Sequence, residues 1–497
     1  MNLKPLYLAF CLAGLAFLCL SCDNHSVIVE ACPTPGFVEC QGTCIDPMTS
    51  DIYCGANEDC ENYSVCVANH MVCNQGICMT SPNTPDPNSC IKFTDQAIQA
   101  YAMLMWDANK DTCISPAEAD AVTQIPTQAF KNNSQLTSLN DLNQFPNLTT
   151  IQEEAFSDCP NLTALELEHI QNIAPNAFNG SPLQHIKLTN IETLTDNFND
   201  VSTLTSIELP HLKTLDGCFS FCPITSVSLP EVKIIKNSFL ECTSLTSINL
   251  PEAEEITSSF DYAEITTLSL PKATHVNAFE RCTALTSIDM PKAVKIIGFN
   301  DSIALTSLNL PEVTEIDGFD TCHALTSLSL PKAINVNGFD NCKALTSLTL
   351  PEAASVSGFT SAEALTTIDL PKAMSINGFT SCKALTSLTL PAAETISTHA
   401  FFCATSLETL NLPKAKTIDS HAFATGESAS QEIPDCHTHS LSLTALYLPE
   451  IESIGPNALD AIDLSACINA SDAHTSQWTC AAEQWCKKTS DIAWACQ

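Results

Sequence analysis

The sequence predicts a repeat solenoid, in which each coil of about 20 residues contributes one short parallel β-strand and buries its apolar side against neighbouring coils. Two observations predict it. Prolines recur every 20 residues from Pro251 to Pro391, each closing an LTSLxLP-like phrase, and the ten residues CKALTSLTLP occur at both 342–351 and 382–391. A stack explains this repetition, because every coil meets a similar neighbour and must satisfy the same packing.

The phase of the repeat predicts which side chains face the interior. In the phrase SLSLP, Leu328 and Leu330 alternate with Ser327 and Ser329, so we expect the leucines inside and the serines outside. Pro331 ends the strand because it cannot donate a ladder hydrogen bond. Glycines at 318, 338, 358 and 378 precede phenylalanines and predict tight bends. A continuous aromatic spine is expected from Phe279, Phe299, Phe319, Phe339, Phe359 and Phe379.

Two further columns follow the period. Cysteines recur at Cys242, Cys282, Cys322, Cys342 and Cys382, with Tyr262, Ser302 and Ala362 interrupting them. A redox or metal ladder is one interpretation, but a small buried thiol filling a corner of each coil is the simpler one, since side chains one strand apart are poorly placed for bridging. The residues after proline, Lys272, Lys292, Glu312, Lys332, Glu352 and Lys372, predict a weak charge ladder that sets register.

Composition and the N-terminus indicate an exported protein. The 56 Asp and Glu against 20 Lys and Arg give a net charge of −36, which argues against nucleic acid as a partner. Residues 1–21 have the pattern of a signal peptide, with Lys4 followed by an apolar run that is too short for a membrane span. Cys22 follows a small residue, as in bacterial lipoprotein signals, and would be the lipidated residue. Ordinary signal cleavage near Ser21 is the alternative.

Residues 22–80 predict a small disulfide-rich module. Eight cysteines crowd this exported segment, which is too short to build a sufficient core without covalent links. A zinc site is the alternative, although the cysteine spacings are irregular. The cysteines are Cys32, Cys40, Cys44, Cys54, Cys60, Cys66, Cys73 and Cys78. Residues 81–90 then predict an extended, proline-containing linker.

Residues 91–124 predict a helix–loop–helix segment with a calcium-loop-like motif. The stretch DANKDTCISPAE carries oxygen ligands at calcium-loop spacing; the candidate ligands are Asp107, Asn109, Asp111, Ser115 and Glu118, with the carbonyl of Cys113. Thr112 stands where such loops have glycine. Ser115, Pro116 and Glu118 also form a capping box that needs no metal. Calcium and the capping box are compatible, and calcium is the one cofactor that the sequence suggests.

The solenoid is expected over residues 125–460 and a disulfide-tied C-terminal cap over 461–497. The period fails between Pro413 and Pro449, where residues 424–442 form a polar insertion. Cys436, His437 and His439 in this insertion suggest a metal only weakly, because they lie too close together to form a complete site. The last segment holds Cys467, Cys480, Cys486 and Cys496, which would tie down a cap over the final apolar coil.

The repeat resembles a known family. The stretch FDNCKALTSLTLPEAASVSGF is similar to the leucine-rich repeats of BspA-like bacterial cell-surface proteins, and AFSDCPNLTAL and AFFCATSLETLNLPKAKTI match the same pattern. The segment WDANKDTCISPAEADAV resembles the calcium-loop segments that precede such repeats. The resemblance implies a leucine-rich repeat solenoid, a place in the cell envelope or on the surface, and a role in adhesion or binding.

The function that follows is binding rather than catalysis. We expect a lipid-anchored protein, at the outer membrane or cell surface, that binds a protein or glycan through outward strand residues. These candidates are Ser287, Asp289, Ser307, Asn309, Ser327, Ser329, Thr367 and Asp369. A passive envelope spacer is the alternative. A carbohydrate-active enzyme is less favoured, because these positions carry Ser and Thr rather than paired carboxylates and the sequence has no G-x-S-x-G or H-E-x-x-H motif.

Overall fold

The computed structural model describes residues 90–425, 445–448 and 450–459, with short strands outside these ranges. The chain divides into two compact units, residues 1–89 and 90–497. In the first unit, β1 (Val38–Cys40) pairs antiparallel with β2 (Thr43–Ile45), and β3 (Met71–Asn74) pairs antiparallel with β4 (Ile77–Thr80). The predicted signal peptide, the rest of the predicted cysteine-rich module and most of the predicted C-terminal cap lie outside the described residues.

The second unit begins with two helices and a 3-10 turn that cover the first coil. These are α1 (Gln96–Met105), α2 (Pro116–Ala121) and η2 (Asn140–Gln144). Asp95 caps α1 by accepting from the backbone N–H groups of Ala97 and Ile98, and it also accepts from Thr137 in the solenoid. Burial raises the pKa of Asp95, but these hydrogen bonds outweigh burial and lower the pKa overall. One buried carboxylate therefore joins the helix to the repeats.

Each coil carries two short parallel strands, one more than the sequence predicts. The first strands, which contain the LTSLxL phrase, are β7 (Ala164–Leu167), β9 (His185–Leu188), β11 (Ser206–Glu208), β13 (Ser226–Ser228), β15 (Ser247–Asn249), β17 (Thr267–Ser269), β19 (Ser287–Asp289), β21 (Ser307–Asn309), β23 (Ser327–Ser329), β25 (Ser347–Thr349), β27 (Thr367–Asp369), β29 (Ser387–Thr389), β31 (Thr409–Asn411) and β33 (Ala445–Tyr447). They form short sheets of two or three strands.

The second strands follow the first strands in the coils that have both, and they build one sheet of three strands and a longer sheet. They are β5 (Gln124–Ile125), β6 (Thr150–Ile151), β8 (Asn172–Ile173), β10 (Thr193–Thr195), β12 (Thr214–Asp216), β14 (Ile234–Lys236), β16 (Glu255–Thr257), β18 (His275–Ala278), β20 (Lys295–Gly298), β22 (Glu315–Gly318), β24 (Asn335–Gly338), β26 (Ser355–Val356), β28 (Ser375–Ile376), β30 (Thr395–Ile396), β32 (Thr417–Ile418) and β34 (Ser453–Ile454).

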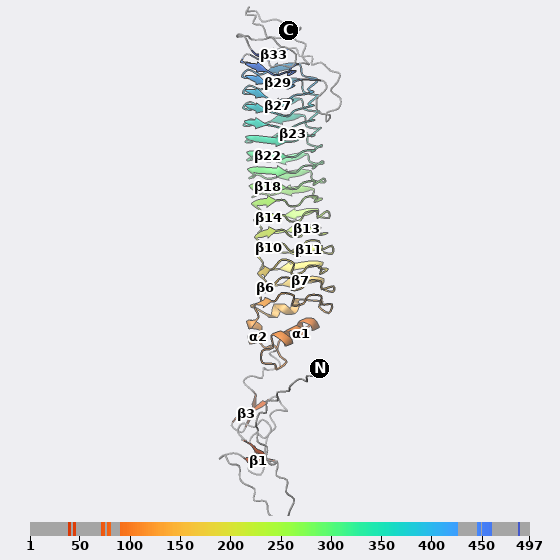
Figure 1. The fold of residues 1–497 in the computed structure, drawn as a ribbon, viewed down its shortest axis with the longest axis vertical. Coiled ribbons are helices and arrows are strands. Elements are labelled where there is room, and N and C mark those ends of the chain that lie inside the picture. The colour runs from red at the N-terminus through yellow and green to blue at the C-terminus, as the bar shows by residue number, and fades with distance from the viewer. Residues whose placement is uncertain are drawn as a thin grey trace, which may run out of the picture. The chain divides into compact units, whose positions relative to one another are not determined.

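Strands β5, β6 and β8 form the sheet of three strands, and the later ones build the longer sheet. The sheet from β10 to β34, with β35 (Cys486–Lys487) added antiparallel at its end, has 14 strands. Figure 1 shows the strands stacked one above another along the solenoid. The fold class is therefore the predicted one. Across the polar insertion, β31 pairs with β33 and β32 with β34, so the coils before and after it stack directly.

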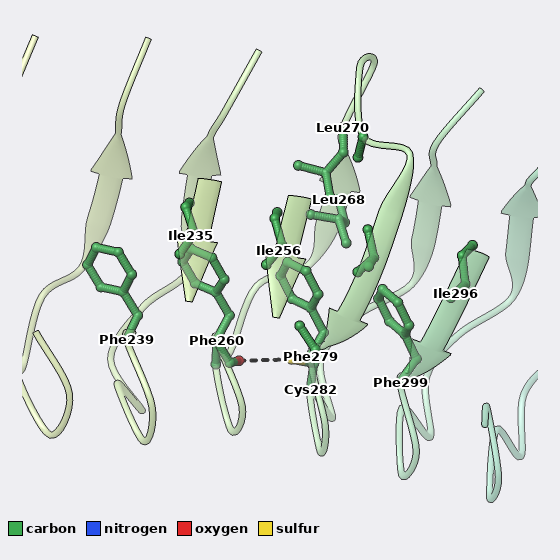
Figure 2. Close-up of a cluster of buried hydrophobic side chains, with 14 of the residues drawn as sticks. Ile235, Phe239, Ile256, Phe260, Leu268, Leu270, Phe279, Cys282, Ile296 and Phe299 are labelled. Atoms are coloured by element: carbon green, nitrogen blue, oxygen red, sulfur yellow. Dashed lines mark hydrogen bonds between the residues drawn. The ribbon is translucent and has the colours of Figure 1, made fainter. Parts of the chain in front are cut away.

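The predicted aromatic spine is confirmed and extends beyond its predicted ends. Neighbouring rings from Phe130 to Phe423 stack at centroid separations of 5.0–5.6 Å. In Figure 2, Phe239, Phe260, Phe279 and Phe299 rise from successive turns in one row. The leucines of the first strands are also buried, as Leu328 and Leu348 show. The core is a continuous stack, and each coil covers the apolar side of the next.

The glycine column has a steric cause as well as the predicted bend. Gly318, Gly338, Gly358 and Gly378 have φ between +92° and +117°. A Cβ built on Gly338 would lie 2.1 Å from the carbonyl oxygen of Gly318 in the preceding coil. Adjacent coils approach so closely here that no side chain fits between them. Earlier coils hold Ser238, Ser259 and Ala278 in this slot, and none of these three residues has a positive φ.

The cysteine column is buried. The residue predicted to interrupt it between Cys242 and Cys282 was wrong. Cys282 and Cys342 are fully buried free thiols that donate to carbonyls of the previous coil, those of Phe260 and Phe319, at 3.4 Å. Burial raises the pKa of Cys222 to about 12 and of Cys242 to about 11, so the thiols stay protonated. Tyr262 does not interrupt this column. The coil after Phe239 is one residue longer, which places buried Ala263 in the slot and Tyr262 outside.

The predicted charge ladder is confirmed for two pairs on the surface, and a third pair, between Lys272 and Glu252, extends it by one coil. Lys272 contacts Glu252 at 2.5 Å, Lys332 contacts Glu312 at 2.5 Å and Lys372 contacts Glu352 at 2.6 Å. All six side chains are substantially exposed, so each pair contributes at most about 1 kcal/mol. Within the described ranges, no helix is long and apolar enough to cross a bilayer.

Candidate binding surface

The outward side chains of the first strands form a polar surface that we call the serine face. It includes all eight residues proposed from the sequence; Ser287 is half-buried and the other seven are exposed. They lie on β19, β21, β23 and β27, where the inward neighbours Leu328 and Ile288 are buried. The alternation of LTSLxL therefore determines which residues a ligand can reach.

One column of the serine face keeps a hydroxyl in every coil. The first outward residue of each strand from β11 to β31 is Ser206, Ser226, Ser247, Thr267, Ser287, Ser307, Ser327, Ser347, Thr367, Ser387 or Thr409. The second outward residue varies among Ser, Thr, Asn, Asp and Glu. Parallel pairing in register places the hydroxyls one strand apart, about 4.8 Å from each other.

A row of threonines borders this column and holds its edge in place. The hydroxyl of Thr286 donates to the carbonyl of Thr266 at 2.9 Å, and the same bond links Thr306 to Thr286 at 3.0 Å. Within the serine face, the Asn309 amide donates to the Asp289 carboxylate at 2.5 Å. The face is thus a regular and partly pre-ordered array of donors and acceptors. Such an array suits a long polar ligand that contacts many coils at once.

The carboxylates of the serine face are not arranged in pairs. Asp289 stands between Ser269 and Asn309, and Asp369 stands next to Thr349. Paired carboxylates of the kind used in glycoside hydrolysis therefore do not occur at these neighbouring positions. This geometry favours binding over acid–base chemistry on this face.

The calcium-loop-like segment folds into a compact loop. Thr112, in the place where calcium loops have glycine, adopts a φ of +65°. The Asp107 carboxylate accepts from the N–H groups of Asp111 and Thr112, and the Asn109 side-chain oxygen also accepts from Asp111. These side-chain oxygens therefore satisfy backbone N–H groups within the loop.

Hydrogen bonds and a disulfide within the chain also hold this segment. Glu118 accepts from the backbone N–H groups of Ala108 and Ser115, and the predicted capping box with Ser115 is present. Cys113 is disulfide-bonded to Cys90. Across the described part of the chain, no three His, Cys, Asp or Glu side chains lie close enough together to hold a metal ion. Calcium at this loop stays a prediction.

Several predicted positions lie outside the described residues. These are Cys22, the insertion residues Cys436, His437 and His439, and the cap cysteines other than Cys486, which lies in β35. Sequence reasoning also missed a feature among the described residues: the exposed turn side chains Phe221 and Tyr262. The signal was present in the sequence, because a large aromatic residue stands there where most coils have a small polar one.

The repeats match a family description. The BspA type leucine rich repeat region matches residues 114–217, 213–318 and 314–430, which together span more than half of the chain. No curated protein sequence matches.

Solved structures with detectable similarity include several repeat proteins. A leucine-rich repeat protein from Bacteroides ovatus has 19% identity and a TM-score of 0.36, over 64% of this chain and 81% of that one. A leucine rich cell surface protein from Faecalibacterium prausnitzii has 19% identity and a TM-score of 0.28, over 57% and 84%. The functional domain of InlJ from Listeria monocytogenes, which includes a cysteine ladder, has 15% identity and a TM-score of 0.25, over 70% and 73%.

Proposed function

Because this chain belongs to the BspA-type leucine-rich repeat family, we propose that it is an exported bacterial surface protein that binds a protein or glycan ligand along the serine face. Repeat solenoids of this class typically serve in binding or at surfaces. The observation that carries the proposal is the outward hydroxyl column that continues from β11 to β31, whose members are exposed or half-buried. Packing does not require it, because these side chains point away from the core.

Binding along the serine face would be multivalent. A single hydrogen bond contributes only about 0.5–1.5 kcal/mol net, because it replaces a bond to water. A ligand that follows the stack repeats the same contact at each coil and adds these small contributions within one complex. The threonine row and the Asp289–Asn309 bond order the face before the ligand arrives, which reduces the entropy lost on binding.

Export and lipid anchoring at Cys22 belong to the same proposal. Lys4, the apolar run that follows and the small residue before Cys22 support a lipoprotein signal. The Cys90–Cys113 disulfide favours an oxidising compartment, where such bonds form and persist. The free thiols of the repeats are compatible with that compartment because they are buried and protonated. Protease treatment of intact cells tests surface display: cleavage of the chain supports it, and full protection contradicts it.

The ligand is tested with the full chain on a glycan array and on immobilised extracellular-matrix proteins. A variant with Ser287→Lys, Ser307→Lys and Ser327→Lys places long cations across the serine face. A matched control carries lysine at Asn335, Ser355 and Ser375, which are exposed and in register on the second strands β24, β26 and β28. The proposal is supported if the first variant no longer binds the ligand and the control variant still binds it. Equal behaviour of both variants contradicts it, and binding to no probe favours a passive spacer.

A further inference from the structure

A second column runs along the turns that follow the aromatic spine. Two residues after each spine phenylalanine from Phe198 to Phe379, the chain places a residue whose φ lies between +53° and +64°. Most of these residues are exposed or half-buried, and Ser381 is buried. We call this the turn column; its members are Asp200, Phe221, Glu241, Tyr262, Arg281, Asp301, Thr321, Asn341, Ser361 and Ser381. The backbone is the same in each coil, because each of these N–H groups donates to a carbonyl of the next coil, as Tyr262 does to Glu280 at 2.8 Å.

Three large side chains interrupt this column of small or acidic residues. Phe221, Tyr262 and Arg281 all occupy the left-handed region, which Asn and Asp tolerate better than bulky residues do. The turn itself therefore favours a smaller residue at each position. Phe221 is 50% exposed and Tyr262 is 38% exposed, so neither is fully buried in the core. Packing does not account for their presence.

Tyr262 and Arg281 occupy adjacent coils and are ordered by mutual contacts, whereas Phe221 lies two coils before Tyr262, with Glu241 between them. The guanidinium of Arg281 lies over the Tyr262 ring, 5.1 Å from its centroid, and donates to the Tyr262 hydroxyl. Arg281 also pairs with Asp301 at 3.5 Å. It is the only arginine in the chain. Aromatic residues and arginine are the side chains that most often dominate the energy of protein interfaces.

The surroundings of this cluster are acidic. Asp200, Glu241 and Asp301 belong to the same column, and Asp261 and Glu280 adjoin Tyr262 and Arg281 in sequence. Burial raises the pKa of Asp261, and burial together with the Asp261 charge raises that of Glu280. The turns of this region thus hold these five carboxylates and one cation, Arg281, which pairs with Asp301. A partner with basic side chains would complement this rim.

We propose that the turn column from Asp200 to Asp301 is a docking site for a polypeptide that presents an apolar anchor flanked by Lys or Arg. The anchor contacts Phe221 and the Tyr262–Arg281 pair, and the basic residues meet the surrounding carboxylates. The site is separate from the serine face, because it lies on the turn that precedes each first strand. It therefore stands or falls independently of the function proposed above.

The test uses the full chain and a displayed library of random peptides. Peptides are selected on the wild-type chain and counter-selected on a variant with Phe221→Asn, Tyr262→Asn and Arg281→Asn. The variant should melt at the same or a higher temperature, because asparagine suits the left-handed turn. A loss of binding would then not come from unfolding. Thr321→Asn, two coils beyond Arg281 in the same column, is the control that should keep full binding.

The proposal predicts enrichment of peptides that combine Lys or Arg with Leu, Phe or Trp. Each enriched peptide, synthesised and measured on its own, should bind the triple variant at least about tenfold more weakly than the wild type. Its binding to the wild type should weaken as the salt concentration rises. The proposal is overturned if no peptide distinguishes wild type from the triple variant. It is also overturned if the peptides that do so are acidic or uncharged, or if the cluster binds a neutral oligosaccharide instead.

Discussion

The core phenylalanine column and the turn column lie two residues apart, yet their residue content differs sharply. From Phe130 to Phe423, each ring of the spine stacks on the next, and each is buried. In the turn column, coils with the same backbone carry Asp, Phe, Glu, Tyr, Arg, Thr, Asn or Ser. Repetition inside the solenoid reflects packing, because every coil meets the same neighbour. A departure from the repeat on the outside, as at Phe221 and Tyr262, therefore marks a second place to seek partner recognition, beside the serine face.

The largest effect should come from opening the spine. Phe339→Ala removes a fully buried ring that stacks on Phe319 and Phe359, and we expect a loss of about 3–5 kcal/mol in the free energy of unfolding. Phe339→Leu should lose clearly less, because it refills most of the space. Chemical denaturation of the full chain measures both. Equal, small losses would show that the spine does not carry the packing described here.

The glycine column should be the next most sensitive. Gly338→Ala drives a Cβ against the Gly318 carbonyl and leaves alanine at a φ of +103°, so we expect a loss of about 2–4 kcal/mol. Ala278→Gly, in the same slot three coils before Gly338, removes a side chain that already fits and should lose about 1 kcal/mol or less. A tolerated Gly338→Ala would mean that the coils are further apart than described.

Calcium should have a smaller effect. If the loop from Asp107 to Glu118 binds it with the weak affinity of a single extracellular loop, adding calcium in excess should stabilise the chain by about 1–3 kcal/mol. Asp107→Asn should abolish this gain while leaving the capping box of Ser115 and Glu118 intact. Thermal unfolding curves recorded with calcium and with a chelator measure this stabilisation. Identical curves would show that the loop does not bind calcium.

Asp320 should contribute more to stability as the pH falls, whereas acid ordinarily destabilises folded proteins. Burial, together with the charges of Asp340 and Asp317, raises the pKa of Asp320. The folded state therefore binds this proton more tightly than the unfolded state, so the contribution of Asp320 to stability grows as pH falls through the raised pKa and is lost as pH rises.

Asp320→Asn removes this charge and keeps the acceptor for the Asp340 N–H, as Asn300 does for Asp320 at 2.8 Å. The variant should melt higher than wild type at about pH 7, and the difference should shrink at about pH 4. Paired melting curves at the two pH values decide it. A difference that is constant with pH, or of the opposite sign, would contradict the raised pKa.

The period of the sequence was enough to predict the interior but not the whole coil. Inward Leu328, the phenylalanine spine and the buried thiols follow from spacing alone, because packing repeats with the chain. The second strand was missed, since a short polar segment such as NVNG has the composition of a turn and pairs only because the stack aligns it. The prediction that Tyr262 lies in the cysteine column was wrong because one coil is a residue longer than the others. Only the register of the neighbouring coils reveals that extra residue.

The candidate surface was predictable to a similar extent. The outward side of the serine face follows from the alternation of LTSLxL, which is local. The clustering of Tyr262 with Arg281 depends on the three-dimensional stacking of two coils whose lengths differ, so the sequence alone did not reveal it.

The central claim is that the outer columns bind while the inner columns hold the fold, and one paired measurement tests it most directly. Thermal unfolding and ligand binding are measured on the same preparation of the Ser287→Lys, Ser307→Lys, Ser327→Lys variant. We predict an unchanged melting temperature with binding lost. A variant that unfolds early, or one that melts normally and binds as wild type does, would contradict the separation of scaffold and surface.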